Sequence, residues 1–92
     1  MIALHQLYYF EAVARELHFA RAAAALGVTP STLSHGIRRL EGEIGAALFV
    51  RTSRHVALTE PGRLLATGLP SSLRRLEAVL GEARAAGHEW TH

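Results

Sequence analysis

Polar side chains that can bond nucleic-acid bases gather in the middle of this chain. On a helix that buries Leu33 and Ile37, the opposite side presents hydroxyls, one imidazole and one guanidinium, from Ser31, Thr32, Ser34, His35 and Arg38. Short hydrogen-bonding groups beside a long cation suit the base edges and phosphates of a DNA major groove. The alternative is an ordinary three-helix core with a solvated polar face.

The tail His88-Glu89-Trp90-Thr91-His92 carries a second chemical pattern, because two histidines four residues apart around a glutamate match the zinc-protease motif. A zinc site also needs a packed helix, a further protein ligand and a cleft, whereas this tail directly follows Gly87. Adventitious metal binding is all that we expect of it. No other histidines have ligand spacing, no serine has an evident histidine–acid pair, and no glycine-rich loop fits a nucleotide. We therefore predict no enzyme, cofactor or metal site.

The charge distribution favours an anionic partner. All ten basic residues are arginine, and five of them lie between Leu17 and Thr59 against two glutamates, a net +3 in a chain whose total is +2. A basic middle between near-neutral ends is typical of a nucleic-acid-binding surface, and a solvated charged surface is the alternative.

Length and composition indicate one small domain that a partner subunit would help to stabilise, since 92 residues, 49% of them hydrophobic, bury a limited core. The absence of cysteine excludes a disulfide scaffold and a cysteine nucleophile. No apolar run reaches the ~20 residues that span a bilayer, and the N-terminus lacks signal-peptide features. We expect a cytoplasmic protein without a membrane partner.

Periodicity predicts three helices at the start of the chain. Apolar spacing indicates a helix over 4–17, and an alanine-rich stretch over 19–26 that ends at Gly27 indicates a second. Thr29-Pro30 opens a third helix over 30–45, with the threonine as cap and the proline in the first turn. A short helix, a tight turn and another helix form a helix-turn-helix.

A hairpin and a long helix are predicted to follow. Two short apolar runs over 48–51 and 55–58 flank a polar turn, and Thr59 can cap a helix over 60–86. Four leucines of this helix have the 4-3-4 spacing of a coiled-coil seam: Leu69, Leu73, Leu76 and Leu80. Pro70 interrupts it, so a bend or break is expected between Thr67 and Ser71.

Seven blocks of this sequence resemble the N-terminal domain of the LysR-type transcriptional regulators, in order and over about residues 2–86. They are Leu7-Tyr8-Tyr9-Phe10, Phe19-Ala20-Arg21-Ala22-Ala23, Leu26-Gly27-Val28-Thr29-Pro30-Ser31, Leu33-Ser34-His35, Ile37-Arg38-Arg39-Leu40-Glu41, Leu48-Phe49-Val50-Arg51 and Leu58-Thr59-Glu60-Pro61-Gly62.

The resemblance implies a mainly α fold, with a winged helix-turn-helix of three helices and a two-stranded wing over 1–59, a linker and dimerisation helix over 60–86, and a tail or hinge over 87–92. It implies sequence-specific binding of double-stranded DNA as a homodimer, with the helix 30–45 in the major groove and Arg54 of the wing at the minor groove. The DNA-binding residues expected are Arg21, Thr29, Pro30, Ser31, Thr32, Ser34, His35, Arg38, Arg51, Arg54 and Thr59. The dimer is expected to form through Leu69, Leu73, Leu76 and Leu80, and a full-length regulator could form a tetramer.

The chain departs from the family pattern at three positions. Relatives usually have serine or threonine at Ala20, whose hydroxyl caps the second helix and can touch a phosphate, so part of both is expected to be lost. Many have glutamine at Pro30 and a longer residue at Gly36, which places base reading on the remaining polar residues of the helix.

The expected C-terminal effector-binding domain of such regulators has no counterpart in these 92 residues. The chain is either a fragment that ends after the linker helix or a naturally short homologue, and the hinge-like tail favours a fragment. A winged helix that binds only proteins is the second function class, and salt-dependent affinity for DNA would distinguish the two.

Overall fold

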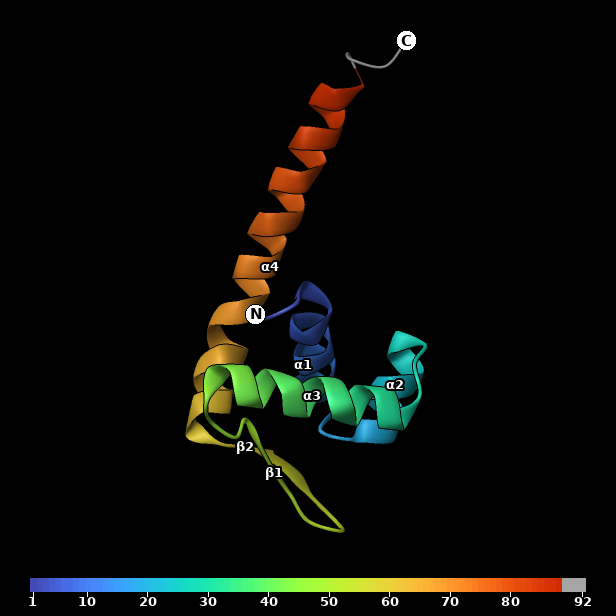
Figure 1. Ribbon diagram of the computed structural model, residues 1–92, viewed down its shortest axis with the longest axis vertical. Coiled ribbons are helices and arrows are strands. Elements are labelled where there is room, and N and C mark those ends of the chain that lie inside the picture. Colours follow the sequence, from blue (N-terminus) through green and yellow to red (C-terminus); the bar gives the residue numbers. More distant parts are fainter. Residues whose placement is uncertain (89–92) are drawn as a thin grey trace.

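The computed structural model describes residues 1–88 and consists of four helices and one two-stranded sheet (Figure 1). The elements are α1 (Leu4–Glu16), α2 (Phe19–Leu26), α3 (Pro30–Ile44), β1 (Phe49–Arg51), β2 (Val56–Leu58) and α4 (Glu60–Gly87). The predicted fold class is confirmed, and every predicted element is present with its ends within about two residues of those expected from the sequence.

The core forms where α1 meets the other helices and the base of the wing. The fully buried large side chains come from α1, α3 and the residue before β1: Phe10, Val13, Leu33, Ile37, Leu40 and Leu48. Ala22 and Ala23 bury the inner face of α2, where their small side chains let the helix approach its neighbours closely. This core fixes the angle at which α3 is presented.

The ends of the helix-turn-helix are set by local chemistry. Thr29 caps α3 by accepting a hydrogen bond from the Thr32 amide at 3.1 Å, as predicted. Gly27 ends α2 in the left-handed conformation, with φ of 73°. The cap whose partial loss was expected at Ala20 is supplied by another residue, His18, whose ring Nδ1 accepts from the Arg21 amide at 3.1 Å.

The wing is a short antiparallel hairpin, in which Phe49 pairs with Leu58 and Arg51 pairs with Val56. The Thr52 hydroxyl accepts a hydrogen bond from the His55 amide at 3.0 Å and so closes the turn. Glu41 of α3 anchors the other end of the hairpin. One of its carboxylate oxygens accepts from the backbone amides of Leu48 at 2.8 Å and Phe49 at 3.3 Å.

The last helix continues through Pro70, so the break expected between Thr67 and Ser71 does not occur, and the alternative, a bend there, stays a prediction. Figure 1 shows one unbroken ribbon across this stretch. Proline removes the amide donor that would bond the Ala66 carbonyl, and the burial of Leu69 and Leu73 in the core holds the helix together at this turn. Hydroxyls near the proline bond other carbonyls of the helix. Thr67 donates to the Arg63 carbonyl at 2.8 Å, and Ser72 donates to the Gly68 carbonyl at 3.2 Å.

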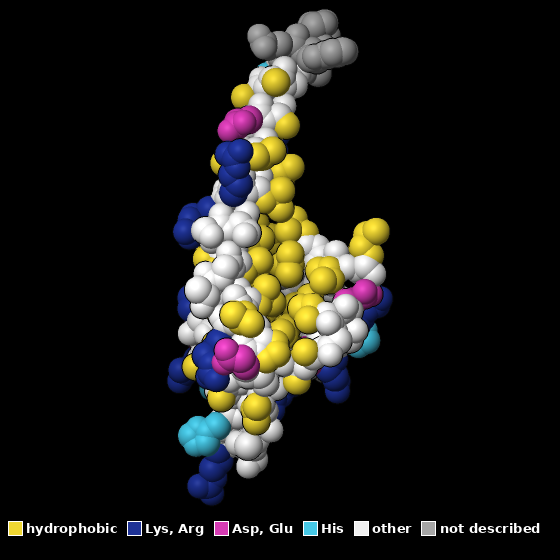
Figure 2. Space-filling model, turned by 90° about the vertical axis from the view of Figure 1, so that its left-hand side faces the viewer, with side chains coloured by type: hydrophobic (Ala, Val, Ile, Leu, Met, Phe, Trp, Pro, Cys, Tyr) yellow, Lys and Arg dark blue, Asp and Glu magenta, His cyan; other side chains and the backbone are white. Residues whose placement is uncertain are grey.

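The four leucines of the expected coiled-coil seam in α4 divide into two pairs, an inner pair, Leu69 and Leu73, next to the globular part and an outer pair, Leu76 and Leu80, farther along the helix. Leu69 and Leu73 are 7% and 4% exposed because they pack into the core of their own domain. These two leucines, expected at a dimer interface, are thus already covered within a single chain, and little of their surface is left for a partner. Beyond them, Leu76, Val79 and Leu80 are each about two-fifths exposed. Figure 2 shows hydrophobic side chains gathered along α4 and down to the globular part.

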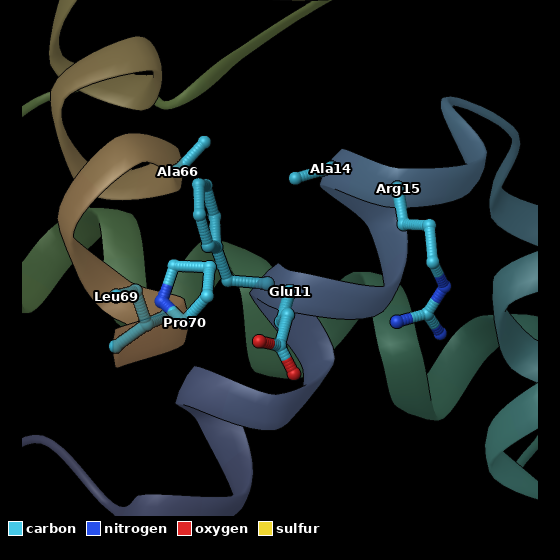
Figure 3. A pocket seen from close by; sticks show the side chains of 7 residues that line it. Glu11, Ala14, Arg15, Ala66, Leu69 and Pro70 are labelled. Carbon is cyan, nitrogen blue, oxygen red and sulfur yellow. The ribbon is translucent and has the colours of Figure 1, made fainter. Parts of the chain in front are cut away.

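A pocket of about 280 Å³ lies where α4 leaves the globular part, between Phe10, Ala14, Ala66 and Leu69, with Glu11, Arg15 and Pro70 completing its lining (Figure 3). Farther along α4, the Tyr8 hydroxyl donates to a Glu77 carboxylate oxygen at 2.7 Å. This hydrogen bond to an anion raises the pKa of Tyr8. The bond joins α1 to α4 and orients the outer half of the long helix.

Candidate nucleic-acid interface

The outward face of α3 presents the predicted polar set to solvent. Ser31, Thr32, His35 and Arg38 are all exposed, while Leu33, Ile37 and Leu40 on the opposite side are completely buried. Helical spacing places His35 farthest from the buried stripe, with Ser31 and Arg38 beside it. A helix with one side in the core and short donors on the other can enter a groove without rearrangement.

Arg51 connects the wing to α3. Its guanidinium donates to the Ser34 hydroxyl at 3.1 Å and lies over the Phe19 ring, 3.9 Å from the ring centroid. Stacking on an aromatic face is favourable for a guanidinium and restricts its motion. Partial burial lowers the pKa of Arg51, and nearby Arg38 lowers it further while Glu41 opposes the change. The guanidinium still carries its charge at neutral pH.

A groove of about 380 Å³ runs between the wing and the start of α2. Its walls are residues 17–20, Ser34 and residues 51–56. Arg54 lines this groove near the tip of the hairpin and is exposed. The groove therefore lies beside the outward polar face of α3 and carries two guanidinium groups.

A smaller pocket of about 220 Å³ flanks α3 on the side of α1 and includes His5, Thr32, His35 and Arg39 in its lining. Close by, the N-terminal ammonium bonds a Glu43 carboxylate oxygen at 2.7 Å. This bond lowers the pKa of Glu43. Cationic groups thus lie on both sides of the outward polar face of α3.

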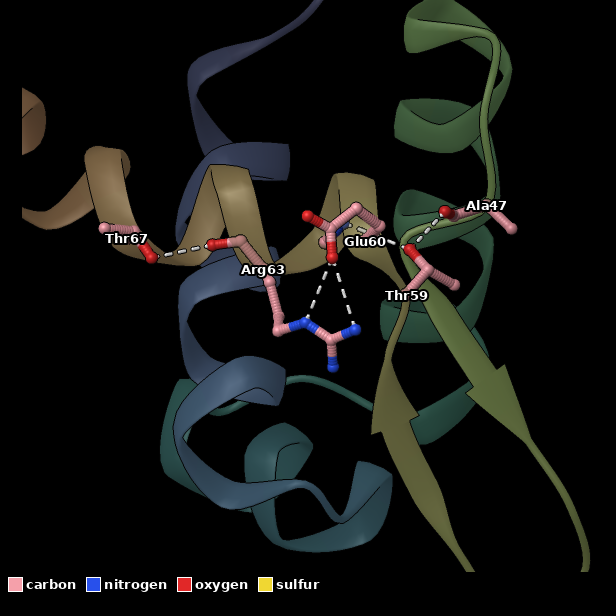
Figure 4. A network of polar contacts seen from close by, with 6 residues as sticks. Ala47, Thr59, Glu60, Arg63 and Thr67 are labelled. Carbon is pink, nitrogen blue, oxygen red and sulfur yellow. Dashed lines mark hydrogen bonds and ion pairs between the residues drawn. The ribbon is translucent and has the colours of Figure 1, made fainter.

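Two of the predicted DNA-binding threonines have structural roles. Thr29 caps α3, and its hydroxyl also donates to the Thr32 hydroxyl at 2.9 Å. Thr59 lies at the base of the wing, where its hydroxyl donates to the Ala47 carbonyl at 2.6 Å and accepts from the Gly62 amide at 3.1 Å (Figure 4). In the same view, Arg63 pairs with Glu60 at 3.3 Å.

The described residues 1–88 contain no helix long and apolar enough to cross a membrane. Within the same range, no three histidine or acidic side chains come together as a metal site would require. The zinc-protease-like pattern at the C-terminus lies outside the described residues, apart from His88.

Comparisons with known proteins assign the family. The model of the bacterial regulatory helix-turn-helix protein, lysR family, matches residues 4–63, which span α1 to the first turn of α4. The chain belongs to the LysR family. It is 48% identical over 81 residues to the HTH-type transcriptional regulator BudR of Klebsiella aerogenes, covering 88% of this chain and 57% of that relative.

Solved structures of LysR-family domains share the fold. The complex of the BenM DNA-binding domain with catB site 1 DNA has a TM-score of 0.85 and 30% identity, covering 92% of this chain and 96% of that one. The complex of the CbnR DNA-binding domain with DNA has a TM-score of 0.85 and 29% identity, covering 92% and 98%. The chain thus corresponds to the DNA-binding part of longer LysR-family regulators, since it spans little more than half of BudR.

The structure of this LysR-family domain gathers most of the predicted site residues around one surface. The α3 residues, Arg51 and Arg54 lie together, and Arg21 is exposed on neighbouring α2. Sequence reasoning missed Arg39 and His18. Arg39 is exposed and lies one helical turn after His35, so helical spacing could have found it. The position of His18 directly before α2 was the signal for its role as cap.

Proposed function

We propose that this LysR-family domain binds double-stranded DNA sequence-specifically as a homodimer and acts in the bacterial cytoplasm as the DNA-binding part of a transcription regulator. The exposed polar face of α3 carries the proposal, because it stands between cationic groups on both sides. The similarity to the BenM and CbnR domains, both solved with DNA, supports the proposed DNA binding.

Each part of the surface has a distinct task in this proposal. His35, Ser31 and Arg38 reach base edges when α3 lies in the major groove, because they occupy its outermost positions. Arg54 near the wing tip enters the minor groove, where a cation senses the narrow, negative groove of A·T-rich sequence. Arg51 holds a backbone phosphate, since its guanidinium is oriented beside α3 before DNA arrives.

The homodimer is proposed to form through the outer half of α4. Leu76, Val79 and Leu80 are exposed on one stripe that continues from the buried Leu69 and Leu73. A second copy would remove this apolar surface from water, which favours association by about 25 cal/mol per Å² buried. The dimer also places two copies of α3 on one duplex.

Binding can be tested on a duplex enriched from a random pool by the wild-type protein. Raising the salt concentration from about 50 to about 200 mM should weaken binding by orders of magnitude, because phosphate contacts release counterions. Fluorescence anisotropy over a salt series measures this slope. Salt-insensitive binding, or no duplex recovered from the pool, would reject the proposed function.

The dimer can be tested by sedimentation velocity. Leu76→Glu should shift the protein to monomer, since a charge would be buried in an apolar contact. Leu64→Glu is the matched control, because Leu64 is 69% exposed and lies near the opposite side of α4. Dissociation by both variants, or by neither, would show that the stripe is not the interface.

A further inference from the structure

His18 has one ring nitrogen committed to the fold. Its Nδ1 accepts from the Arg21 backbone amide at 3.1 Å and so caps α2. A backbone N–H can only donate, so Nδ1 carries no proton in this arrangement. The proton of the neutral imidazole is therefore on Nε2, where the ring has a fixed donor that the cap does not use.

The ring of His18 is exposed and lines the groove between the wing and the start of α2. Arg51 lines the same groove, and its guanidinium stacks on Phe19, the residue next to His18. Ala20 lies between these groups and has no side chain beyond Cβ, which leaves room for a ligand. The groove thus combines a neutral donor and a cation, both held by bonds within the protein.

The position of the groove indicates which anion it would hold. Ser34 of α3 is part of its wall, so the groove borders the reading helix. A helix in the major groove has a sugar–phosphate backbone on each side, and donors beside the helix meet phosphate oxygens. Base edges lie deeper, opposite His35 and Arg38.

We infer that His18 binds a DNA backbone phosphate through Nε2–H, beside Arg51. This inference rests on the proposed DNA binding and adds a phosphate contact that carries no sequence information. Because the donor is neutral, the contact adds affinity without adding a counterion to the salt slope.

Two substitutions separate the cap from the phosphate contact. His18→Ser keeps a side-chain oxygen that can cap α2 but removes the Nε2 donor, whereas His18→Ala removes both. We expect His18→Ser to weaken binding to the enriched duplex about tenfold, equally across single-base variants and with an unchanged salt slope. Thermal unfolding should show a loss of stability for His18→Ala only. A role as cap alone predicts instead that serine restores wild-type affinity, which would overturn the inference.

Methylphosphonate substitution, one phosphate at a time, identifies the contact in the DNA. At the contacted phosphate, wild type should lose about tenfold more affinity than His18→Ser. The two proteins should then bind that duplex equally, even though Arg51 loses part of its contact in both. A tenfold difference that persists at every substituted position would also overturn the inference, because His18 would then act through the protein. If wild type itself shows no salt-dependent binding to any duplex, the proposed function fails, which is a different result.

Discussion

Glu41 provides the sharpest test of how the wing is held. Its carboxylate is the acceptor for the Leu48 amide at 2.8 Å and the Phe49 amide at 3.3 Å. Both amides are part of the backbone that leads from α3 into β1, and the side chains of Leu48 and Phe49 are in the core. Glu41→Ala removes the acceptor for both donors at once, without touching the outward face of α3.

The expected cost follows from these two bonds. A buried donor left without an acceptor costs about 1–3 kcal/mol, and the lower part of this range applies to each amide here because Glu41 is only partly buried. We therefore expect Glu41→Ala to lower the free energy of unfolding by about 2 kcal/mol. For a domain of this size, that corresponds to a fall in Tm of roughly 8–16 °C.

Glu43→Ala is the matched control, because Glu43 lies on the same helix and bonds only the exposed N-terminal ammonium among the contacts described. Its loss should leave the stability close to that of wild type, because an exposed ion pair contributes little. Thermal unfolding by circular dichroism at one protein concentration compares the three proteins, and amide hydrogen exchange at Leu48 and Phe49 locates the change. Equal Tm values for the two variants would refute the assigned role of Glu41.

Three further predictions concern α3 and the wing. Gly36→Ala should lower Tm because the new Cβ would lie 2.6 Å from the Tyr9 ring, which outweighs a gain in helix propensity of about 1 kcal/mol. In a Tyr9→Ala background, the same substitution should raise Tm. His35→Ala should change the preferred base at one position of each half-site. Arg54→Ala should weaken binding to all sites, most of all to those with A·T-rich flanks, and lower the salt slope by about one. The reverse pattern across a panel of operator variants would contradict the assigned roles. Arg51→Lys should weaken DNA binding several-fold at an unchanged salt slope, since lysine keeps the charge but cannot reproduce the hydrogen bond to Ser34 and the stacking on Phe19 in one planar group. Wild-type affinity for this variant in a DNA titration would show that these two contacts do not contribute to binding.

The helix-turn-helix could be predicted from the sequence because its signals are local. Thr29 and Pro30 begin α3 and Gly27 ends α2, each through a bond or dihedral angle that involves only nearby residues. The apolar spacing of α3 also predicted the burial of Leu33, Ile37 and Leu40, although Ile44, which has the same spacing, is 40% exposed. Local patterns of this kind predict the structure correctly when the tertiary contacts favour the same helix ends and the same buried side.

Pro70 shows where local propensity fails. Leu69 and Leu73 stand on either side of its turn and are both buried in the core, so packing holds α4 together across the proline. The same burial shows that two leucines of the expected seam, Leu69 and Leu73, are covered by their own domain. A 4-3-4 spacing says that one side of a helix is covered, but not whether the cover is a partner chain or the helix's own domain.

The contacts that organise the site were out of reach of pattern reasoning because they join residues distant in sequence. Ser34 was predicted as a base-reading residue, yet its hydroxyl accepts from Arg51, 17 positions away. Neither a serine nor an arginine indicates by its type that it forms such a pair. His18 escaped for a different reason, since histidine is not among the preferred capping residues.

These long-range bonds make α3 and the wing a single reading unit. Ser34 bonds Arg51 and Glu41 bonds the start of β1, and the two α3 residues are about 10 Å apart along the helix axis. One bond would fix a distance, but two separated bonds also fix the orientation of the hairpin relative to α3. The spacing between His35, proposed to lie in the major groove, and Arg54, proposed to lie in the minor groove, is then largely set before DNA arrives. Little conformational freedom remains to be lost on binding, which is how a small surface with few base contacts can hold one register on its operator.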